Sequence, residues 1–164
     1  MNQAVYSLSR IPGALFVRLA RREKRPVGRD WPTLATDRLE EVAGWVEAGA
    51  NVGLLLGPSS GLVDVEFDSP EGLESLQAHG IAGINTPTWR SDRGEHRLFR
   101  WSPALPATGW RKAGGLEVRI GGNPAQSVLP PSIHPSGAPY RWLIPPTDCA
   151  PAELPASLLE EVGA

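Results

Sequence analysis

Residues 51–72 read NVGLLLGPSSGLVDVEFDSPEG, and this stretch decides the fold class of the chain. Its first part, residues 51–56, is a mostly apolar run closed by a Gly-Pro pair, which is typical of a buried strand. Residues 61–68 alternate apolar and acidic side chains, so we expect a second strand with one apolar face. Ser69 and Pro70 then occupy the positions of a helix N-cap and a first helical residue. Two strands followed directly by a helix indicate a protein that mixes both kinds of structure.

Outward from this stretch, the chain predicts short elements joined by many turns, because 18 glycines and 17 prolines interrupt its 164 residues. Residues 11–20 fit either a strand or a helix, since their apolar period is ambiguous. The patterns elsewhere predict helices over 36–49 and 155–162, strands over 97–101, 116–120 and 127–129, and irregular Pro-rich turns over 130–147. Together these elements predict a single domain over residues 1–164, of the α+β class, with mixed, largely antiparallel sheets and flanking helices.

The composition excludes several classes of protein. Cys149 is the only cysteine, which rules out an internal disulfide framework and a cysteine-rich zinc site. No apolar run approaches the roughly 20 residues needed to span a bilayer, so we expect no membrane contact. The N-terminus has no signal-peptide pattern, and the chain is therefore expected in the cytoplasm.

The charges of the chain are unevenly distributed, although the net charge of −2 argues against a general nucleic-acid coat. Residues 1–36 contain seven basic and two acidic residues, whereas the remainder contains nine basic and sixteen acidic residues. A basic segment can contact phosphates while an acidic centre binds cations. A solvated basic surface loop is the alternative interpretation.

Asp64, Glu66 and Asp68 occupy every second position of the predicted strand over 61–68, so their side chains leave the same face. Neighbours on that face are roughly 7 Å apart, and like charges so placed repel one another. A strand tolerates this repulsion where the face is fully solvated or where cations neutralise it. Carboxylate ligands suit Mg²⁺ or Mn²⁺ better than zinc. A metal site and a solvated sheet face are therefore the two hypotheses.

The segment LEVRI, residues 116–120, adds a further acid beside a base. Glu117 and Arg119 point to the polar face of this predicted strand. If the strand pairs beside the acidic one, Glu117 joins Glu66 and Asp68 around an ion. Otherwise Glu117 and Arg119 form an ordinary exposed face.

Two polar turns carry further candidate residues. In TPTWRSDRGEHRLFRW, between the two acidic strands, a Gly-containing turn can present Arg93 and His96 to an anionic group. A surface or core histidine is the alternative. In SVLPPSIHPSGAPYRW, near the C-terminus, prolines fix the backbone and hold Ser132 and His134 in a rigid turn. A simple Pro-rich connector is the alternative there.

Taken in order, these segments resemble the N-terminal catalytic domain of bifunctional DNA primase/polymerases, the prim-pol branch of the archaeo-eukaryotic primase superfamily. The resemblance covers most of the chain, from about Lys24 to Trp142. It rests on five segments in the family's order: KRPVGRDW (24–31), the strand–strand–helix stretch (51–72), RGEHRLFR (93–100), LEVRIGG (116–122) and LPPSIHPSGAPYRW (129–142).

The resemblance implies a metal site and a catalytic histidine. Glu66 and Asp68 match the family's acidic pair, in the register set by the flanking Gly and Pro-Glu residues, and Asp64 is then an extra acid of open role. Glu117 matches the third metal ligand, with Glu in place of the commoner Asp. His96 matches the histidine that contacts the phosphates of the incoming nucleotide. The implied catalytic residues are thus Glu66, Asp68, His96 and Glu117, and the implied cofactor is Mg²⁺ or Mn²⁺ on the three acids.

The resemblance also implies contacts to nucleotide and to DNA. In the basic segment, Lys24 and Arg25 would hold the template backbone, and Trp31 would stack on a base unless it belongs to the core. The implied partners are a DNA template and primer, nucleoside triphosphates, and a helicase domain or subunit. The expected nucleotide pocket contains Arg93, His96, Arg119, Ser132 and His134.

The function that follows from the resemblance is metal-dependent nucleotidyl transfer by a DNA primase/polymerase in replication. Two divalent ions held by the acids would act on the attacking 3′-hydroxyl and the leaving pyrophosphate. A non-catalytic DNA- or nucleotide-binding module of a larger replication or mobile-element protein is the alternative from another class. A metal-dependent phosphohydrolase that uses the same carboxylates is a third hypothesis.

Overall fold

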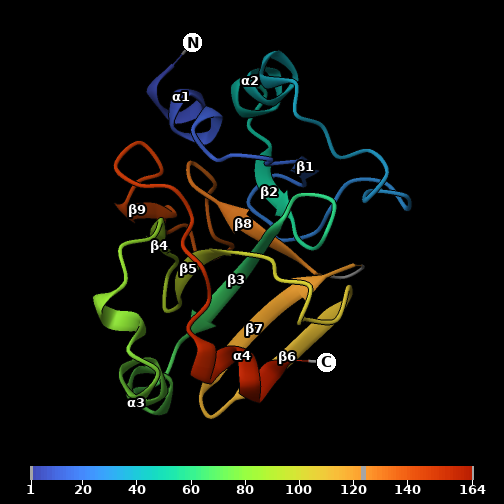
Figure 1. The fold of residues 1–164 in the computed structure, drawn as a ribbon. Coiled ribbons are helices and arrows are strands. Elements are labelled where there is room, and N and C mark those ends of the chain that lie inside the picture. The colour runs from blue at the N-terminus through green and yellow to red at the C-terminus, as the bar shows by residue number, and fades with distance from the viewer. Residues whose placement is uncertain (1, 123–124, 164) are drawn as a thin grey trace.

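The computed structural model of the protein describes residues 2–122 and 125–163 (Figure 1). Within these residues, nine strands form two antiparallel sheets flanked by four α-helices, which confirms the predicted α+β fold. The small sheet has the order β1-β2-β8, from β1 (Phe16–Leu19), β2 (Asn51–Leu55) and β8 (Gln126–Leu129). The large sheet has the order β6-β7-β3-β5-β4-β9, from β3 (Leu62–Phe67), β4 (Thr88–Arg90), β5 (Glu95–Arg100), β6 (Gly109–Ala113), β7 (Leu116–Gly121) and β9 (Arg141–Ile144). Both ends of the predicted domain, residues 1 and 164, lie outside the described residues, whereas every predicted site residue lies within them.

The four α-helices are α1 (Gln3–Ser9), α2 (Leu39–Glu47), α3 (Pro70–Ala78) and α4 (Ala156–Val162), and local contacts set where α2 and α3 begin. In α3, the Ser69 hydroxyl accepts a hydrogen bond from the Gly72 amide at 3.1 Å and Pro70 is the first helical residue, as the sequence predicts. α2 begins later than predicted, because the backbone of Thr36 exchanges two hydrogen bonds with Phe16 of β1. No helix in the described part of the chain is long and apolar enough to cross a membrane.

Several elements escape the sequence patterns. β4 has three residues, too few to show an alternation. β9 lies in the segment predicted to form only irregular turns, and its half-exposed residues pair with β4 at the edge of the large sheet. The ambiguous segment 11–20 contains β1. α1 and β6 were likewise not expected, although the strands over 97–101, 116–120 and 127–129 lie within two residues of β5, β7 and β8.

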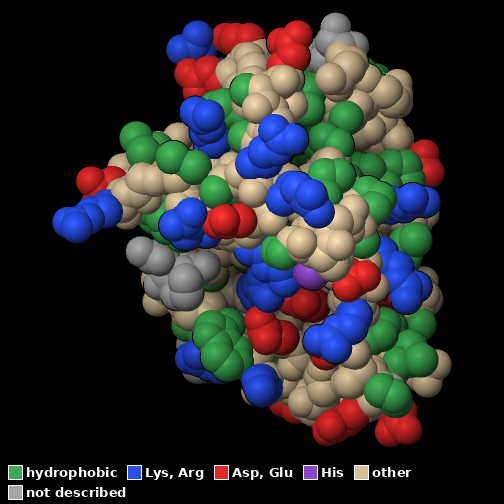
Figure 2. All heavy atoms as spheres, turned by 180° about the vertical axis from the view of Figure 1, so that it is seen from behind, with side chains coloured by type: hydrophobic (Ala, Val, Ile, Leu, Met, Phe, Trp, Pro, Cys, Tyr) green, Lys and Arg blue, Asp and Glu red, His purple; other side chains and the backbone are tan. Residues whose placement is uncertain are grey.

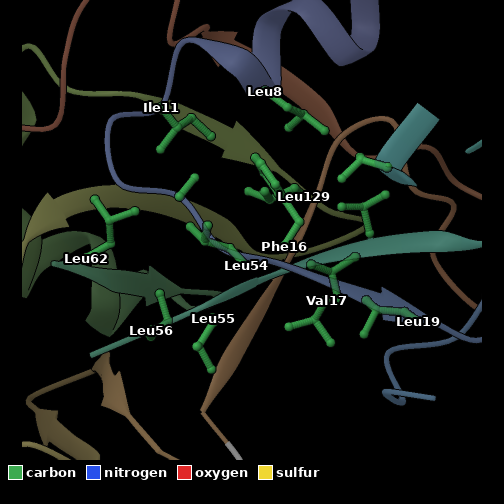
Figure 3. Close-up of a cluster of buried hydrophobic side chains, with 14 of the residues drawn as sticks. Leu8, Ile11, Phe16, Val17, Leu19, Leu54, Leu55, Leu56, Leu62 and Leu129 are labelled. Atoms are coloured by element: carbon green, nitrogen blue, oxygen red, sulfur yellow. The ribbon is translucent and has the colours of Figure 1, made fainter. Parts of the chain in front are cut away.

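One hydrophobic core surrounds the small sheet (Figure 3). Leu8 of α1, Phe16 of β1, Leu54 of β2 and Leu129 of β8 are all nearly inaccessible to water and pack together there. Leu62, at the start of β3, joins this core from the large sheet. The small sheet is thereby packed against one face of the large sheet.

The second core covers the opposite face of the large sheet. Val63 and Val65 of β3 and Val118 of β7 pack against Leu76 of α3 and Leu158 of α4. These valines are the apolar face that the alternation in residues 61–68 predicts. The acidic side chains of β3 therefore point the other way, toward the small sheet.

Candidate active site

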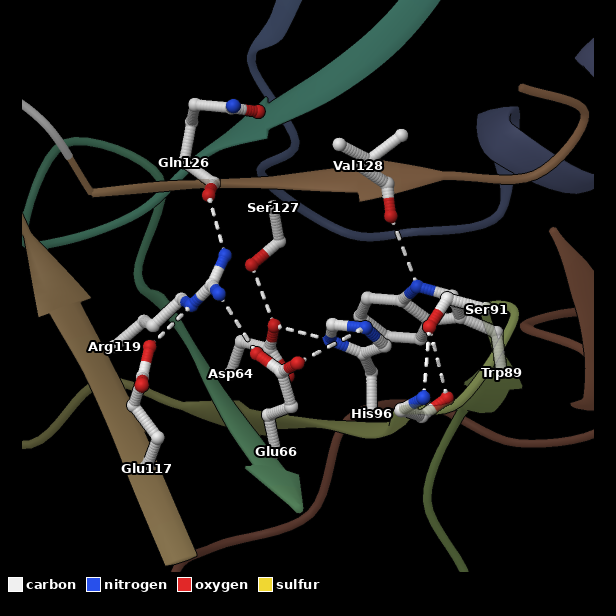
Figure 4. A network of polar contacts seen from close by, with 11 residues as sticks. Asp64, Glu66, Trp89, Ser91, His96, Glu117, Arg119, Gln126, Ser127 and Val128 are labelled. Carbon is white, nitrogen blue, oxygen red and sulfur yellow. Dashed lines mark hydrogen bonds and ion pairs between the residues drawn. The ribbon is translucent and has the colours of Figure 1, made fainter. Parts of the chain in front are cut away.

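A row of facing residues crosses all six strands of the large sheet on the side of the small sheet. Each strand contributes one register partner, and the row runs Lys112, Glu117, Glu66, His96, Trp89 and Trp142 from β6 to β9. Arg119 and Asp64 face each other in the adjacent row. The conditional expectation that residues 116–120 pair beside the acidic strand is confirmed, and Glu117 is the direct partner of Glu66. The sheet register thus collects the charged residues in one place (Figure 4).

Asp64 is fully buried and joins the two sheets. Its Oδ2 lies 2.8 Å from His96 Nδ1 and accepts a hydrogen bond of 2.5 Å from the Ser127 hydroxyl of β8. Its other oxygen, Oδ1, is buried and has no hydrogen-bond partner among the described residues. The extra acid of the sequence is therefore a central member of the site.

The His96 ring is held on two sides. Trp89 stacks on it, with ring centroids 5.0 Å apart and planes inclined by 7°. The indole N–H of Trp89 donates to the Val128 carbonyl of β8 at 2.9 Å, so the stack is itself anchored to the small sheet (Figure 4). Because Asp64 occupies Nδ1, the other ring nitrogen, Nε2, faces Glu66 Oε1 at 3.9 Å.

Arg119 connects the remaining two acids. Its Nη2 lies 2.8 Å from Glu66 Oε2, and its Nε donates to Glu117 Oε1 at 2.9 Å. Its Nη1 also donates to the Gln126 carbonyl at 3.3 Å. Three carboxylates thus share two cationic side chains, which leaves an excess of negative charge when all five groups are ionised.

The protonation of the buried acids differs from one to the next. Burial alone opposes the charge of Asp64, but the charge and hydrogen bond of His96 outweigh it and hold the pKa of Asp64 below its usual range. Burial also opposes the charge of His96, and Asp64 in turn raises the pKa of His96 above its ordinary value. For Glu66, burial prevails over the nearby cations and raises its pKa. Asp64 and His96 therefore each favour the charged form of the other, whereas burial favours the neutral form of Glu66.

The donor set fits a hard divalent cation. One ligand atom from each of Asp64, Glu66 and His96 lies within 4.8 Å of the others. The unpartnered Asp64 Oδ1 is costly in a protein interior unless a cation or a donor satisfies it. Carboxylate oxygens are ligands typical of Mg²⁺ and Mn²⁺. The buried acids are therefore suited to such an ion, and the metal type is open.

Asp68 lies apart from this buried group. β3 ends at Phe67, and Asp68 is exposed in the turn that leads to the N-cap of α3. It lines a pocket of about 260 Å³ together with Glu66, Glu117 and Lys112. The structure thus brings the three predicted metal ligands to one pocket, but it places Asp64, and not Asp68, within ligand distance of Glu66 and His96.

Gly94 makes room for the Glu66 carboxylate. A Cβ at this position would lie 2.9 Å from Glu66 Oε1 and 3.7 Å from His96 Nε2. The preceding turn is closed by the Ser91 hydroxyl, which accepts a hydrogen bond from the Gly94 amide at 2.9 Å. This glycine lies two residues before His96 in the segment RGEHRLFR.

Basic groups form one margin of the site. Arg93 is exposed in the turn before β5, and Lys24 is exposed in the loop after β1. Burial and then the charge of Lys24 lower the pKa of His134, and Arg93 adds a smaller effect in the same direction, against the opposing charge of Asp92. Seen from behind the view of Figure 1, Lys and Arg side chains gather around a hollow that holds acidic side chains beside a histidine (Figure 2).

Two of the predicted contacts have structural roles. Ser132 is buried, and its hydroxyl accepts from the Val52 amide at 2.8 Å and donates to the Val52 carbonyl at 3.2 Å, which fastens the Pro-rich turn to β2. Trp31 is 6% exposed and packs in the core around the small sheet, as the packing alternative expects. The prediction that Trp31 stacks on a base is therefore wrong, because protein covers its ring. Arg25 is exposed and pairs with Glu23 at 3.1 Å.

The sequence did not single out Trp89 and Ser127 as parts of the site, and it left the role of Asp64 open. Their contacts join residues far apart in the chain, such as Ser127 with Asp64, so a local pattern contains no sign of them. For Asp64 a signal was present. The cap at Ser69 requires the strand to end before it, which places Asp68 outside the ladder and leaves Asp64 and Glu66 as the paired acids.

One comparison with known proteins gives a match. The family model described as bifunctional DNA primase/polymerase, N-terminal, matches residues 7–157, nearly the whole chain. No curated protein matches the chain. The matched segment contains the whole six-strand row, from Glu66 to Trp142, and the loop that carries Lys24. On this match the chain belongs to the family of N-terminal domains of bifunctional DNA primase/polymerases.

Proposed function

We propose that this chain is a metal-dependent nucleotidyltransferase that acts as a DNA primase/polymerase, adding nucleotides from nucleoside triphosphates to a strand paired with a DNA template. The observation that supports it most is the buried Asp64–Glu66–His96 group, whose unpartnered Asp64 Oδ1 suits a divalent cation. The family supports the same class of reaction. A basic margin beside the acids suits a triphosphate.

The acids of the row would hold the metal. We assign Asp64, Glu66 and Glu117 as ligands, and Asp68 as an acid at the margin of the adjoining pocket. When bound, Mg²⁺ or Mn²⁺ supplies positive charge for the triphosphate and lowers the pKa of the attacking hydroxyl. A metal with carboxylate ligands also offsets the excess negative charge of the row.

The chain's own residues would orient the triphosphate. His96 is fixed by Asp64 and Trp89, so its free edge keeps one direction toward the site. Arg93, Lys24 and His134 at the margin contact the outer phosphates by charge-assisted hydrogen bonds. Arg119 holds Glu66 and Glu117 in place. Lys24 and Arg25 also bind the template backbone, and a helicase domain or subunit remains a predicted partner.

A pair of charge-removing variants tests the proposal and the choice of ligands together. Glu66→Gln should lower the rate of labelled dNTP incorporation on a primed template by at least ~100-fold, because losing even a group that only orients a metal ligand costs about 10–100-fold. Asp68→Asn removes the same charge from an exposed acid in the same pocket, and it should keep most of the activity. Calorimetric titration of Mn²⁺ plus dNTP should lose its metal-dependent binding in Glu66→Gln alone.

Other outcomes identify other functions. Release of phosphate from dNTP without incorporation would indicate a phosphohydrolase. DNA retention without either reaction would indicate a binding module. If Asp68→Asn abolished activity while Asp64→Asn and Glu66→Gln did not, the ligand assignment would be wrong.

A further inference from the structure

The edge strand β6 exposes an aromatic ring on the active-site side of the large sheet. Trp110 is 47% exposed, and its register partner on β7 is Arg119, which binds Glu66 and Glu117. Lys112, two residues on, is the register partner of Glu117 and lines the same pocket as Glu66. The ring and the amine lie together, with Lys112 Nζ 5.8 Å from the indole centroid.

Alternation along β6 explains why this ring faces the site. Ala113 is buried in the second core, and Arg111 is the register partner of the buried Val118, so these two residues take the helix side of the strand. Trp110 and Lys112 take the other side. In the described part of the chain, α3 and α4 pack in the second core, on the opposite face of the large sheet. Neither of these two helices therefore covers Trp110. β6 is the last strand of the sheet, with β7 as its neighbour.

Exposure by itself does not mark a binding surface, and the opposite edge of the sheet shows why. Leu143 of β9 is 50% exposed on the other edge strand, and single exposed apolar side chains are ordinary. Trp110 differs because its exposed group is a flat aromatic ring, with the Lys112 amine over the ring and the acidic row next to both. A flat π-face with an adjacent ammonium group matches a nucleobase joined to a phosphate.

We propose that Trp110 and Lys112 form a contact surface for single-stranded nucleic acid, in which a base stacks on the Trp110 indole and a phosphate pairs with Lys112. This inference rests on the proposed function, because it supplies the strand on which the acidic row acts. Stacking on a ring tolerates any base, so the surface binds without sequence preference. Its position beside the pocket of Glu66 and Glu117 places the bound strand next to the predicted metal ligands.

Binding of a fluorescently labelled oligo(dT) by the full chain, followed by anisotropy without metal or nucleotide, tests this surface. Trp110→Ala should weaken binding roughly five- to hundredfold, the effect of one lost base stack. Trp110→Phe keeps an aromatic face and should retain most of the affinity. Leu143→Ala, which removes a similarly exposed apolar side chain from the other edge strand, should leave affinity unchanged. Affinity falls as the salt concentration rises, and Lys112→Ala should make this dependence shallower. The slope of log affinity against log salt should become less negative by about 0.7, the value for one phosphate contact on a single strand.

Four results would overturn the proposal. They are equal affinities of wild type and Trp110→Ala, no measurable binding by wild type, an equal loss in Leu143→Ala, and a self-association of the chain that depends on Trp110. Thermal melting checks that Trp110→Ala folds, and if it does not, the salt dependence of Lys112→Ala tests the same surface: an unchanged slope would overturn the proposal. The incorporation assay is read separately. Incorporation with unchanged oligonucleotide binding in Trp110→Ala refutes this surface alone, whereas Trp110-dependent binding without incorporation refutes the proposed function alone.

Discussion

The two faces of the large sheet are made by the same strands, yet one is an apolar core and the other a charged site. On β3, Val63 and Val65 pack against helices, while Asp64 and Glu66 between and after them face His96 and Arg119. Burial does not separate the faces, because Asp64 is as inaccessible as its valine neighbours. The faces differ in what stabilises their buried side chains, which is apolar packing on one face and specific polar partners on the other.

This contrast shows how a short strand can hold charges rigidly. On the helix side, each side chain is stabilised by the apolar area it removes from water. On the site side, each charge needs a specific partner, and the partners come from β5, β7 and β8. Period-two alternation lets the apolar face fix the strand so that the charged face keeps its geometry.

The largest effect is expected on the helix side. Phe99 of β5 is fully buried in the second core, so Phe99→Ala should lower the free energy of unfolding by about 3–5 kcal/mol. Arg100→Ala, the next residue, removes an exposed ion pair with Glu153 and should change it by less than about 1 kcal/mol. Urea unfolding measures both. Similar losses in the two variants would mean that this face is not the main source of stability.

On the site side, a single oxygen atom should matter almost as much. Ser127→Ala removes the hydroxyl that donates to the buried Asp64 carboxylate, and hydrogen bonds to charged groups contribute about 1.5–3 kcal/mol. Ser60→Ala is the matched control, because Ser60 is also buried but makes only a long bond of 3.4 Å to the Gly57 carbonyl. Urea unfolding should show a clear loss in the first variant and little in the second. No loss in Ser127→Ala would indicate that the charges of His96 and Arg119 are sufficient to stabilise Asp64.

Local patterns predict the helix side of the sheet better than the site side. The alternation in residues 61–68 and the cap at Ser69 are sufficient for β3 and α3, because both depend on neighbours in the chain. The pairing of β3 with β7 was only a conditional expectation, because acids that face each other across two strands repel, and it is the structure that shows it. Local patterns do not predict β4 and β9, because these short strands form only through their pairing with each other and with the rest of the sheet.

The candidate site is predictable in composition but not in its connections. The sequence indicates that Glu66, Glu117 and His96 belong together, and the register places them in one row. The cap at Ser69 separates Asp68 from the other two acids, but alternation alone does not show how deeply Asp64 is buried, because it defines a face and not a depth. The depth of Asp64 comes from β8, which reaches it through Ser127 across 63 positions of sequence.

The smallest effect on the free energy of unfolding is expected in the turn before β5, at Gly94. Gly94→Ala would place a methyl group 2.9 Å from Glu66 Oε1, and the carboxylate must move away because the turn is closed by Ser91. Since the group that moves is the end of a side chain, the free energy of unfolding should change by only about 0.5 kcal/mol. The rate of dNTP incorporation should nevertheless fall about tenfold, because misplacing a reacting group by less than 1 Å is costly in catalysis.

Gly83→Ala is the control for this variant, because a Cβ at Gly83 meets no atom within 4 Å. It should leave both the unfolding free energy and the incorporation rate near their wild-type values. Gly94→Ala with normal activity would show that the Glu66 carboxylate has freedom to move without loss of function. A loss of stability as large as that of Phe99→Ala would show instead that the turn supports the fold. The expected combination, a stable protein with impaired chemistry, would separate the function of the charged face from the stability that the apolar face provides.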